Sequence, residues 1–340
     1  MTAPALPRDA RKVLVMELAG LGDNVHLLPA LWLVRQQYPQ AQLHVMASAH
    51  AADLFRLTPW VHRVWAYPRA PRAPGFLANL DWGRKLRAER FDLLVNTTGS
   101  DRSSLLSWLS RAPVRLGRRP ADGGPPGWRH LFTQVMEQPY YLEPMYLQKW
   151  KALRSAGFAS GAQPEFNVAI DPALRRAADI GREDEGRYVH LSPCTTADKR
   201  ELPLAQQAQL LEQLRATHPQ LKIALSCAPN ERERRKLQDL LGRLSAPPWR
   251  VYAGTLDVPA LAAVIEKAAL HLCGDTGALH IALMTQTPTV AWFRTHKGQH
   301  EWIPLFPQYR VLIADGGPED ALHGIGTDDL LAAARELLSS

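Results

Sequence analysis

The chain has few cysteines and no hydrophobic run long enough to cross a membrane. Its three cysteines, Cys194, Cys227 and Cys273, have neither the number nor the spacing of a disulfide framework or a zinc site. We therefore expect reduced, partly buried thiols. No apolar stretch approaches the roughly 18 residues of a membrane span. An internal repeat and a low-complexity tract are also missing from the sequence, which excludes a solenoid.

The N-terminal stretch lacks the apolar core of a secretory signal. Arg8, Asp9, Arg11 and Lys12 stand ahead of a short β-type run, so we expect a cytoplasmic protein. The length of 340 residues exceeds one typical domain of about 100–200 residues, which predicts two domains. With 46% hydrophobic and 21% charged residues, either half can bury a core of its own.

A formal net charge of +7 favours an anionic partner such as a phosphate, a nucleic acid or a membrane surface. Basic residues are concentrated in the first half, so we expect the first domain to meet this partner. No nucleic-acid-binding motif is present, and the arginines are dispersed instead of lying along one helix. A nucleic-acid partner is therefore disfavoured.

Short apolar runs alternate with amphipathic stretches along the whole chain, which is typical of α/β proteins with parallel sheets. Helices are expected from just after Asp23 to Tyr38 and over 140–156. Buried strands are predicted at 13–18, 43–48, 61–67, 91–98, 188–193, 222–227, 249–254, 270–274, 287–293 and 310–314.

Two stretches interrupt this alternation. The segment RLGRRPADGGPPGWRH (115–130) is dense in Gly, Pro and Arg, which predicts a long exposed loop without regular structure. Long loops of this kind are often functional. The range 158–187 holds little core pattern and is the candidate linker, so the predicted domains are 1–157 and 188–340.

The stretch ELAGLGDNVHLLP (17–29) follows the first predicted strand. In a parallel sheet, ligands bind outside the carboxyl ends of strands, where helix N-termini present free N–H groups. Gly20 and Gly22 allow a tight turn there, and Asp23 is either a helix cap or a functional carboxylate. The third glycine of a dinucleotide fingerprint and its acidic partner are missing, so a Rossmann dehydrogenase is disfavoured.

The stretch HLSPCTTADKRELP (190–203) is a loop that leaves a predicted strand. The hydroxyls of Ser192, Thr195 and Thr196 stand beside Lys199 and Arg200. Hydroxyl and cationic donors in one loop make a plausible phosphate site. The alternative is a solvated charged loop that leads into the next helix.

The stretch CGDTGALHIALMTQTPTVAWF (273–293) combines a turn, a helix-like run and a strand. Gly274 and Gly277 permit close backbone approach, and Thr276 supplies a hydroxyl and an N–H where a pyrophosphate would lie. Asp275 would repel a phosphate, so it suits a sugar hydroxyl or a cation better. His280 either points back to the turn or packs in the core.

With these three turns in this order, the chain resembles glycosyltransferase family 9, the heptosyltransferases that build the lipopolysaccharide inner core. The matching stretches are GLGDNVHLLPAL, SPCTTADKRELP and GDTGALHIALMTQTPTVAWF, and their spacing matches over nearly the whole chain. The resemblance implies a GT-B fold, in which two Rossmann-like domains with parallel sheets face each other across a cleft. Domain 1–157 would bind the acceptor and domain 188–340 the nucleotide-sugar, with the last helix a candidate to pack back on the first domain.

The reaction implied by the resemblance is an inverting, metal-independent transfer of a sugar to a hydroxyl of a lipopolysaccharide-core or related glycan. The default donor is ADP-heptose, which is a substrate, so no cofactor is implied. Asp23 matches the proposed general base, and Lys199 or Arg200 would steady the leaving diphosphate. The implied donor-binding residues are Thr195, Thr196, Gly274, Asp275, Thr276, Gly277 and His280, and the N-terminal turn contributes Gly20 and Gly22.

This implied chemistry agrees with elementary requirements of glycosyl transfer. A sugar hydroxyl is a poor nucleophile until a carboxylate takes its proton, and a diphosphate leaves only when its growing charge is compensated. The basic first domain suits an anionic glycolipid at the cytoplasmic face of the inner membrane, to which we expect peripheral attachment.

Two departures from the family pattern and two rival functions stay open. One departure is the Gly/Pro/Arg loop 115–130, whose charge favours a role in binding the acceptor. The stretch FRTHKGQHEW (293–302) stands where the family commonly has a Gly-Pro-Thr type loop, which bears on the choice of sugar. A non-catalytic nucleotide-sugar-binding protein would have no need of Asp23 or of the basic middle motif. A GT-B nucleotide-sugar epimerase would not need a basic acceptor-binding domain.

Overall fold

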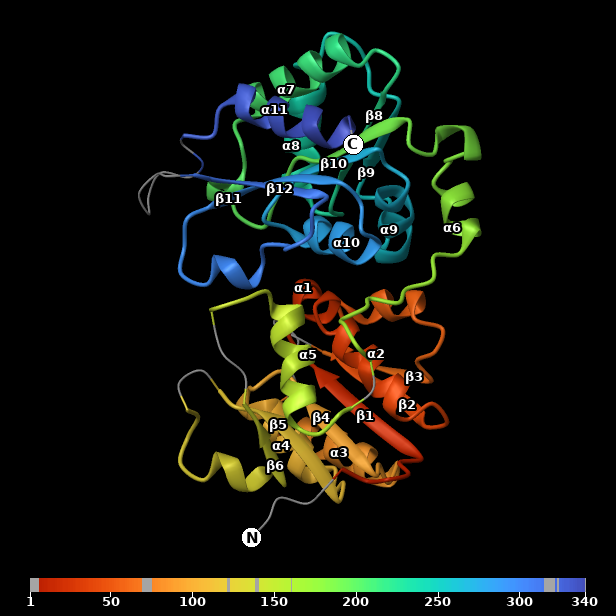
Figure 1. Ribbon diagram of the computed structural model, residues 1–340, viewed down its shortest axis with the longest axis vertical. Coiled ribbons are helices and arrows are strands. Elements are labelled where there is room, and N and C mark those ends of the chain that lie inside the picture. Colours follow the sequence, from red (N-terminus) through yellow and green to blue (C-terminus); the bar gives the residue numbers. More distant parts are fainter. Residues whose placement is uncertain are drawn as a thin grey trace. The chain divides into compact units, whose positions relative to one another are not determined.

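The computed structural model describes residues 6–68, 75–120, 123–137, 141–159, 161–314, 322 and 324–339, and Figure 1 shows its helices and strands. The chain divides into two compact units, Met1–Ala169 and Ile170–Ser340. Each unit has hydrophobic core clusters of its own. Across the described ranges, we find no helix whose length and apolar character would let it cross a bilayer.

The first unit is built on a six-stranded parallel sheet in the order β3-β2-β1-β4-β5-β6. This order places a topological switch between β1 and β4, because the chain winds outward from there in both directions. The strands are β1 (Lys12–Glu17), β2 (Gln42–Ser48), β3 (Arg63–Tyr67), β4 (Leu93–Asn96), β5 (Val114–Arg118) and β6 (Gln134–Met136).

The helices of the first unit form two groups, with α2 packed on α5 and α3 packed on α4. Two groups are what a parallel sheet covered on both faces requires. The helices are α1 (Leu21–Val25), α2 (Leu28–Gln37), α3 (Phe76–Ala88), α4 (Asp101–Leu109) and α5 (Met145–Ser155), with short 3-10 helices η1 (Ala52–Leu57) and η2 (Trp128–Leu131).

The second unit repeats the same topology. Its parallel sheet has the order β12-β11-β10-β7-β8-β9, so its switch lies between β7 and β10. The expected α/β fold with parallel sheets is confirmed in both units. The strands are β7 (Tyr188–Ser192), β8 (Lys222–Cys227), β9 (Arg250–Ala253), β10 (Leu270–Gly274), β11 (Thr289–Arg294) and β12 (Tyr309–Ala314).

The helices of the second unit also fall into two groups. Helix α10 packs with α9 and α9 with α6, whereas α7 packs with α8 and α11. The last helix, α11, contributes Leu330, Leu331 and Ala334 to the core cluster of this second sheet. The helices are α6 (Pro172–Ala177), α7 (Leu204–Thr217), α8 (Glu231–Leu241), α9 (Val258–Glu266), α10 (Gly277–Thr285) and α11 (Thr327–Leu338), with 3-10 helices η3 (Arg182–Asp184), η4 (Asp198–Arg200) and η5 (Gln299–Glu301).

The prediction that 115–130 has no regular structure is wrong at both ends of that segment, where β5 and η2 form. A Cβ on Gly117 would lie 2.5 Å from the ring of Phe132, so the glycine lets this ring pack directly on the strand. The guanidinium of Arg115 donates to two backbone carbonyls at 2.6 and 3.0 Å. These hydrogen bonds satisfy its donors, so this arginine is compatible with a strand.

Two further boundaries differ from the expectations. The first helix begins at Leu21, so Gly22 and Asp23 lie inside its first turn, and a separate helix α2 begins at Leu28. The range 158–187 divides between the two units at Ala169. It is packed on both sides of that point: Phe158 and Phe166 are buried in the first unit, and Arg175 pairs with Glu266 of α9 at 2.6 Å in the second.

The three cysteines are free thiols, as expected, with Cys194 and Cys273 buried and Cys227 partly buried.

Two histidines form an unusual polar contact inside the second unit. His190 on β7 and His271 on β10 lie with their Nδ1 atoms 3.0 Å apart, and His190 Nε2 lies 3.0 Å from the hydroxyl of Ser226. Both side chains are fully buried. Burial lowers the pKa of His271 to about 3 and holds the pKa of His190 well below its usual value.

This histidine pair predicts an acid-sensitive second unit. The unfolded chain, with histidine pKa values near 6.5, binds more protons than the folded chain, so stability is lost as the pH falls below about 6.5. We expect a loss of about 2 kcal/mol per histidine between pH 7 and pH 5. Urea unfolding at several pH values measures this loss of unfolding free energy. The loss should be smaller in His271→Asn than in the wild type, and unchanged in the exposed control His300→Asn. If the free energy of unfolding fell equally steeply with pH in the two variants, the histidine pair would not be the cause of the acid sensitivity.

Candidate functional site

The first candidate turn follows β1 at the switch of the first sheet. Gly20 precedes α1 in an extended conformation, and its N–H donates to Oδ2 of Asp23 at 3.1 Å. Asp23 therefore caps the helix, which is one of the two roles that the sequence predicts for it. The other carboxylate oxygen, Oδ1, accepts no hydrogen bond from the described residues. Capping and a chemical role are compatible, because they use different oxygens.

The surroundings of Asp23 shift its proton affinity upward. Burial is the largest influence and raises its pKa above the ordinary value. The ammonium of Lys149 opposes this shift, the carboxylate of Glu17 adds to it, and Arg118 at the end of β5 lowers the pKa by a smaller amount. A raised pKa makes a carboxylate a stronger base at neutral pH.

A buried ion pair holds the backbone of this turn in place. Lys149 Nζ on α5 lies 2.7 Å from Glu17 Oε2 and also donates to the backbone carbonyl of Asp23 at 2.7 Å. Hydroxyls of Thr97 and Thr98 donate to the Glu17 carboxylate at 2.7 and 3.2 Å. Burial would raise the pKa of Glu17, but Lys149 and Thr97 hold it below its ordinary value. Removing one partner would leave an uncompensated buried charge, which typically costs about 3–5 kcal/mol.

Sequence reasoning missed this pair. An acidic residue that closes an otherwise apolar strand was a usable signal for Glu17, since burial of a carboxylate demands a partner. Lys149 gave no such signal, because α5 carries other cations and only the packing of α5 against the first turn distinguishes it.

The second candidate site joins two loops of the second unit. Strands β7 and β10 pair in parallel, with Cys273 beside Ser192, so the loops that follow them leave the sheet side by side. A Cβ on Gly274 would lie 2.8 Å from the carbonyl oxygen of Arg200 and 3.0 Å from Cγ2 of Thr195. Glycine is therefore required at 274 for the two loops to meet.

A cation and a carboxylate face each other where these loops meet. Arg200 donates to Asp275 at 2.9 Å, and the Asp275 side chain is only 10% exposed, against 37% for Arg200. Lys199 is exposed, and it makes no ion pair with any described residue. The structure thus places Arg200 beside the Gly274–Gly277 turn, and the repulsion expected between Asp275 and a phosphate is offset by the guanidinium.

The loop after β7 is held by a network of polar contacts around the buried Glu201. Glu201 accepts the N–H of Thr195 at 2.7 Å and pairs with Arg232 at 2.6 Å and with Lys236, both from α8. The Thr195 hydroxyl donates to the carbonyl of Ala197, so this side chain is used within the loop. The side chain of Thr196 is exposed. The sequence did not single out Glu201, Arg232 or Lys236.

Helix α10 begins at the same place. Thr276 precedes it in an extended conformation, and its side chain makes no capping hydrogen bond. The first N–H groups of a helix attract anions because they have no partner within the helix. The indole Nε1 of Trp292, wholly buried on β11, finds no acceptor among the described residues and lies 2.8 Å from the position of a Cβ on Gly274. An uncapped helix start and an unused buried donor both suit an anionic or hydroxyl-rich ligand.

His280 lies one turn into α10. It is buried, its ring lies 5.3 Å from that of Trp302, and burial lowers its pKa to about 4 against the opposing influence of Asp275. It is therefore uncharged at neutral pH. Trp302 belongs to the divergent stretch 293–302, which in this way packs against the first turns of α10. No group of three or more His, Cys, Asp or Glu side chains suited to a metal ion occurs among the residues described.

Comparisons with known proteins agree with this geometry. The model of glycosyltransferase family 9 (heptosyltransferase) matches residues 80–322. The lipopolysaccharide core heptosyltransferase OpsX of Haemophilus influenzae is 21% identical over 296 residues, which cover 86% of this chain and 82% of the relative.

Solved structures show the same fold. A family 9 glycosyltransferase from Veillonella parvula superposes with a TM-score of 0.84 at 17% identity, covering 98% of this chain and 99% of its own. The Escherichia coli heptosyltransferase WaaC, solved with ADP-2-deoxy-2-fluoro heptose, gives a TM-score of 0.76 at 17% identity, covering 96% and 99%. The GT-B fold implied by the resemblance is thereby confirmed. Since the family model matches well over half of the chain, this protein belongs to glycosyltransferase family 9 and is a glycosyltransferase.

Proposed function

We propose that the protein transfers heptose from ADP-heptose to a hydroxyl of a lipopolysaccharide-core or related glycan, with inversion of the anomeric centre and without a metal ion. The observation that carries this proposal is the turn Gly274–Gly277 at the N-terminus of α10, with the Arg200–Asp275 ion pair beside it. The donor and acceptor classes follow from a relative named as a lipopolysaccharide core heptosyltransferase and from a related structure solved with an ADP-heptose analogue.

The donor diphosphate would lie against the first N–H groups of α10, near Thr276 and Gly277. The guanidinium of Arg200 would compensate the charge that grows on the leaving ADP, and stabilisation of such charge is usually a large part of catalysis. Asp275, whose own charge is balanced by Arg200, would accept a hydrogen bond from a ribose or sugar hydroxyl. Thr195, Thr196 and Gly274 would line the same donor site.

The acceptor hydroxyl would lose its proton to Asp23. Oδ1 of this carboxylate accepts no hydrogen bond from the described residues, and burial raises its pKa, as a general base requires. Lys149 and Glu17 would fix the backbone that carries it. A non-catalytic nucleotide-sugar-binding protein would not need this arrangement, and an epimerase would need its acid and base around the donor sugar.

Replacing Asp23 by Asn should abolish transfer and spare donor binding. The amide keeps the cap on Gly20 but takes no proton, so we expect kcat to fall by about 10²–10⁴-fold while ADP affinity by calorimetry stays the same. Asp81→Asn, which removes an exposed carboxylate from α3, is the matched control. Normal turnover by Asp23→Asn would show that another group is the base.

Arg200 and Lys199 should differ in their contribution to donor binding. Hydrogen bonds to charged groups contribute about 1.5–3 kcal/mol, so Arg200→Ala should weaken ADP binding about tenfold or more. Lys199→Ala should change the affinity for ADP less than about twofold, because an exposed charge contributes little binding free energy. Calorimetric titration of both variants with ADP checks this, and a larger loss in Lys199→Ala would reverse the assignment.

We also propose peripheral attachment to the cytoplasmic face of the inner membrane, where an anionic glycolipid acceptor would lie. Helix α3 supports this, because Leu77 is 78% exposed at its start and Lys85 and Arg87 are exposed near its end. Exposed apolar and basic side chains together favour an anionic lipid surface. Co-sedimentation should be stronger with vesicles containing phosphatidylglycerol than with phosphatidylcholine alone, and Leu77→Gln should reduce it. Equal binding to both vesicles would remove this proposal.

A further inference from the structure

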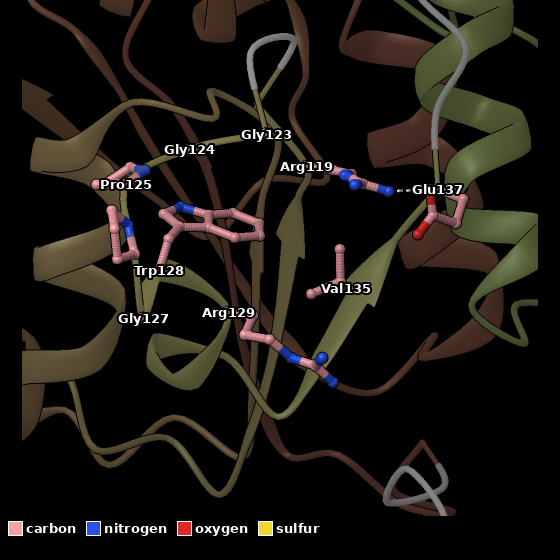
Figure 2. A pocket seen from close by; sticks show the side chains of 10 residues that line it. Arg119, Gly123, Gly124, Pro125, Gly127, Trp128, Arg129, Val135 and Glu137 are labelled. Carbon is pink, nitrogen blue, oxygen red and sulfur yellow. Dashed lines mark ion pairs between the residues drawn. The ribbon is translucent and has the colours of Figure 1, made fainter.

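A pocket of about 450 Å³ lies in the first unit, outside the site described above. Its walls come from the loop that follows β5, from η2 and from the end of β6. Figure 2 shows Trp128 on one side of the pocket, Arg119 and Glu137 on the other, and Val135 and Arg129 between them. The volume lies within the range of about 300–1,000 Å³ that small-molecule sites occupy.

The charges of the pocket favour an anion. Arg119 and Glu137 face each other at 3.8 Å, and both are largely exposed, so their attraction is weak. Arg129 is exposed, and its guanidinium makes no ion pair with the described residues. Among the described residues that line the pocket, two guanidinium groups stand against one carboxylate, which is an excess of positive charge. Guanidinium matches the planar geometry of carboxylate and phosphate oxygens.

The remaining walls suit a small ring with hydroxyls. Gly123 and Gly127 have positive φ angles of 86° and 81°, and open space surrounds the position of a Cβ on each, so the backbone is bare at these two positions. Pro125 and Pro126 complete this wall. The indole of Trp128 is fixed, because its Nε1 donates to Ser104 at 2.9 Å and its ring packs 5.0 Å from Phe132. A rigid apolar face beside polar backbone is a common way to hold an amphipathic ligand.

The pocket and Asp23 lie at the same edge of one sheet. Strand β5, which leads into the pocket, is two strands away from β1. Neighbouring strands lie about 4.8 Å apart, so the ends of β1 and β5 are separated by about 10 Å. This distance exceeds the width of one sugar ring. Arg118, the residue immediately before the pocket, is close enough to lower the pKa of Asp23.

We propose that this pocket binds a phosphate or carboxylate group carried on a sugar, and that this sugar is a neighbour, within the acceptor, of the one whose hydroxyl reacts. Arg129 and Arg119 hold the anionic group, and Trp128 and the glycine backbone hold the ring. The second part rests on the proposed function, because it takes Asp23 as the base. The first part, binding of an anionic sugar, does not.

The test is a calorimetric titration of the full-length protein, in the presence of saturating ADP, with glucose 6-phosphate, galacturonate, glucose and inorganic phosphate. Glucose 6-phosphate or galacturonate should bind, and whichever binds more tightly identifies the anionic group. Glucose or inorganic phosphate binding as tightly as the better of these two would overturn the proposal.

Opposite charge changes locate the binding in this pocket. Arg129→Gln should weaken binding of the anionic sugar by about three- to tenfold, and Glu137→Gln should tighten it by a similar factor. Partial unfolding cannot produce effects of opposite sign. The control Arg84→Gln removes an exposed charge from α3 and should leave the affinity unchanged. Shifts in the same direction for Arg129→Gln and Glu137→Gln, or no shift in either, would exclude the pocket.

A transfer assay then tests the link to the acceptor. Arg129→Gln should raise the acceptor KM and leave kcat nearly unchanged, and it should have no effect on an acceptor from which the anionic substituents have been removed. An equal effect on both acceptors would show that the pocket does not recognise the anionic group of the acceptor. The titration needs no turnover, so it can succeed or fail independently of the proposed transfer reaction.

Discussion

Both candidate turns exist because each parallel sheet reverses its winding in the middle. At the switch between β1 and β4, and again between β7 and β10, adjacent strands send their following loops to opposite faces, which leaves helix starts uncovered at one edge. Asp23 lies after β1, and Gly274 to Gly277 lie after β10. Both turns thus lie at the switch of their sheet but after different strands, because the counterpart of β1 in the second sheet is β7 and the counterpart of β4 is β10.

The two carboxylates at these positions differ in their contact with cations. Asp275 is paired with Arg200, so a diphosphate could approach the start of α10 without facing a bare carboxylate. Asp23 has no direct ion pair among the described residues, but the Lys149–Glu17 pair beneath it fixes its backbone. The difference suits the proposed roles, because a carboxylate that accepts hydroxyl hydrogen bonds tolerates a salt bridge, whereas a base needs an available lone pair.

The sequence was most informative where one residue type has one physical use. Buried parallel strands read as continuous apolar runs, so β1, β7 and β10 were found nearly to the residue, and Gly274 was selected because only glycine allows its close approach. Strand β5 was missed because its arginines and glycine argue against a strand, and the packing of Phe132 on Gly117 is a tertiary contact. Lys149, Arg232 and Lys236 were missed for the same reason: many surface helices carry such cations, and only the fold brings these against a buried carboxylate.

Sugar transfer itself is the activity on which the proposed roles of Asp23 and Arg200 depend. The decisive measurement is to incubate the purified protein with ADP-heptose and a lipopolysaccharide-core glycan in the presence of a chelator, and to determine the product linkage by NMR. We expect release of ADP and a new glycosidic bond whose anomeric configuration is opposite to that of the donor. A product with retained configuration, or the absence of any product while ADP-heptose binds, would contradict this expectation.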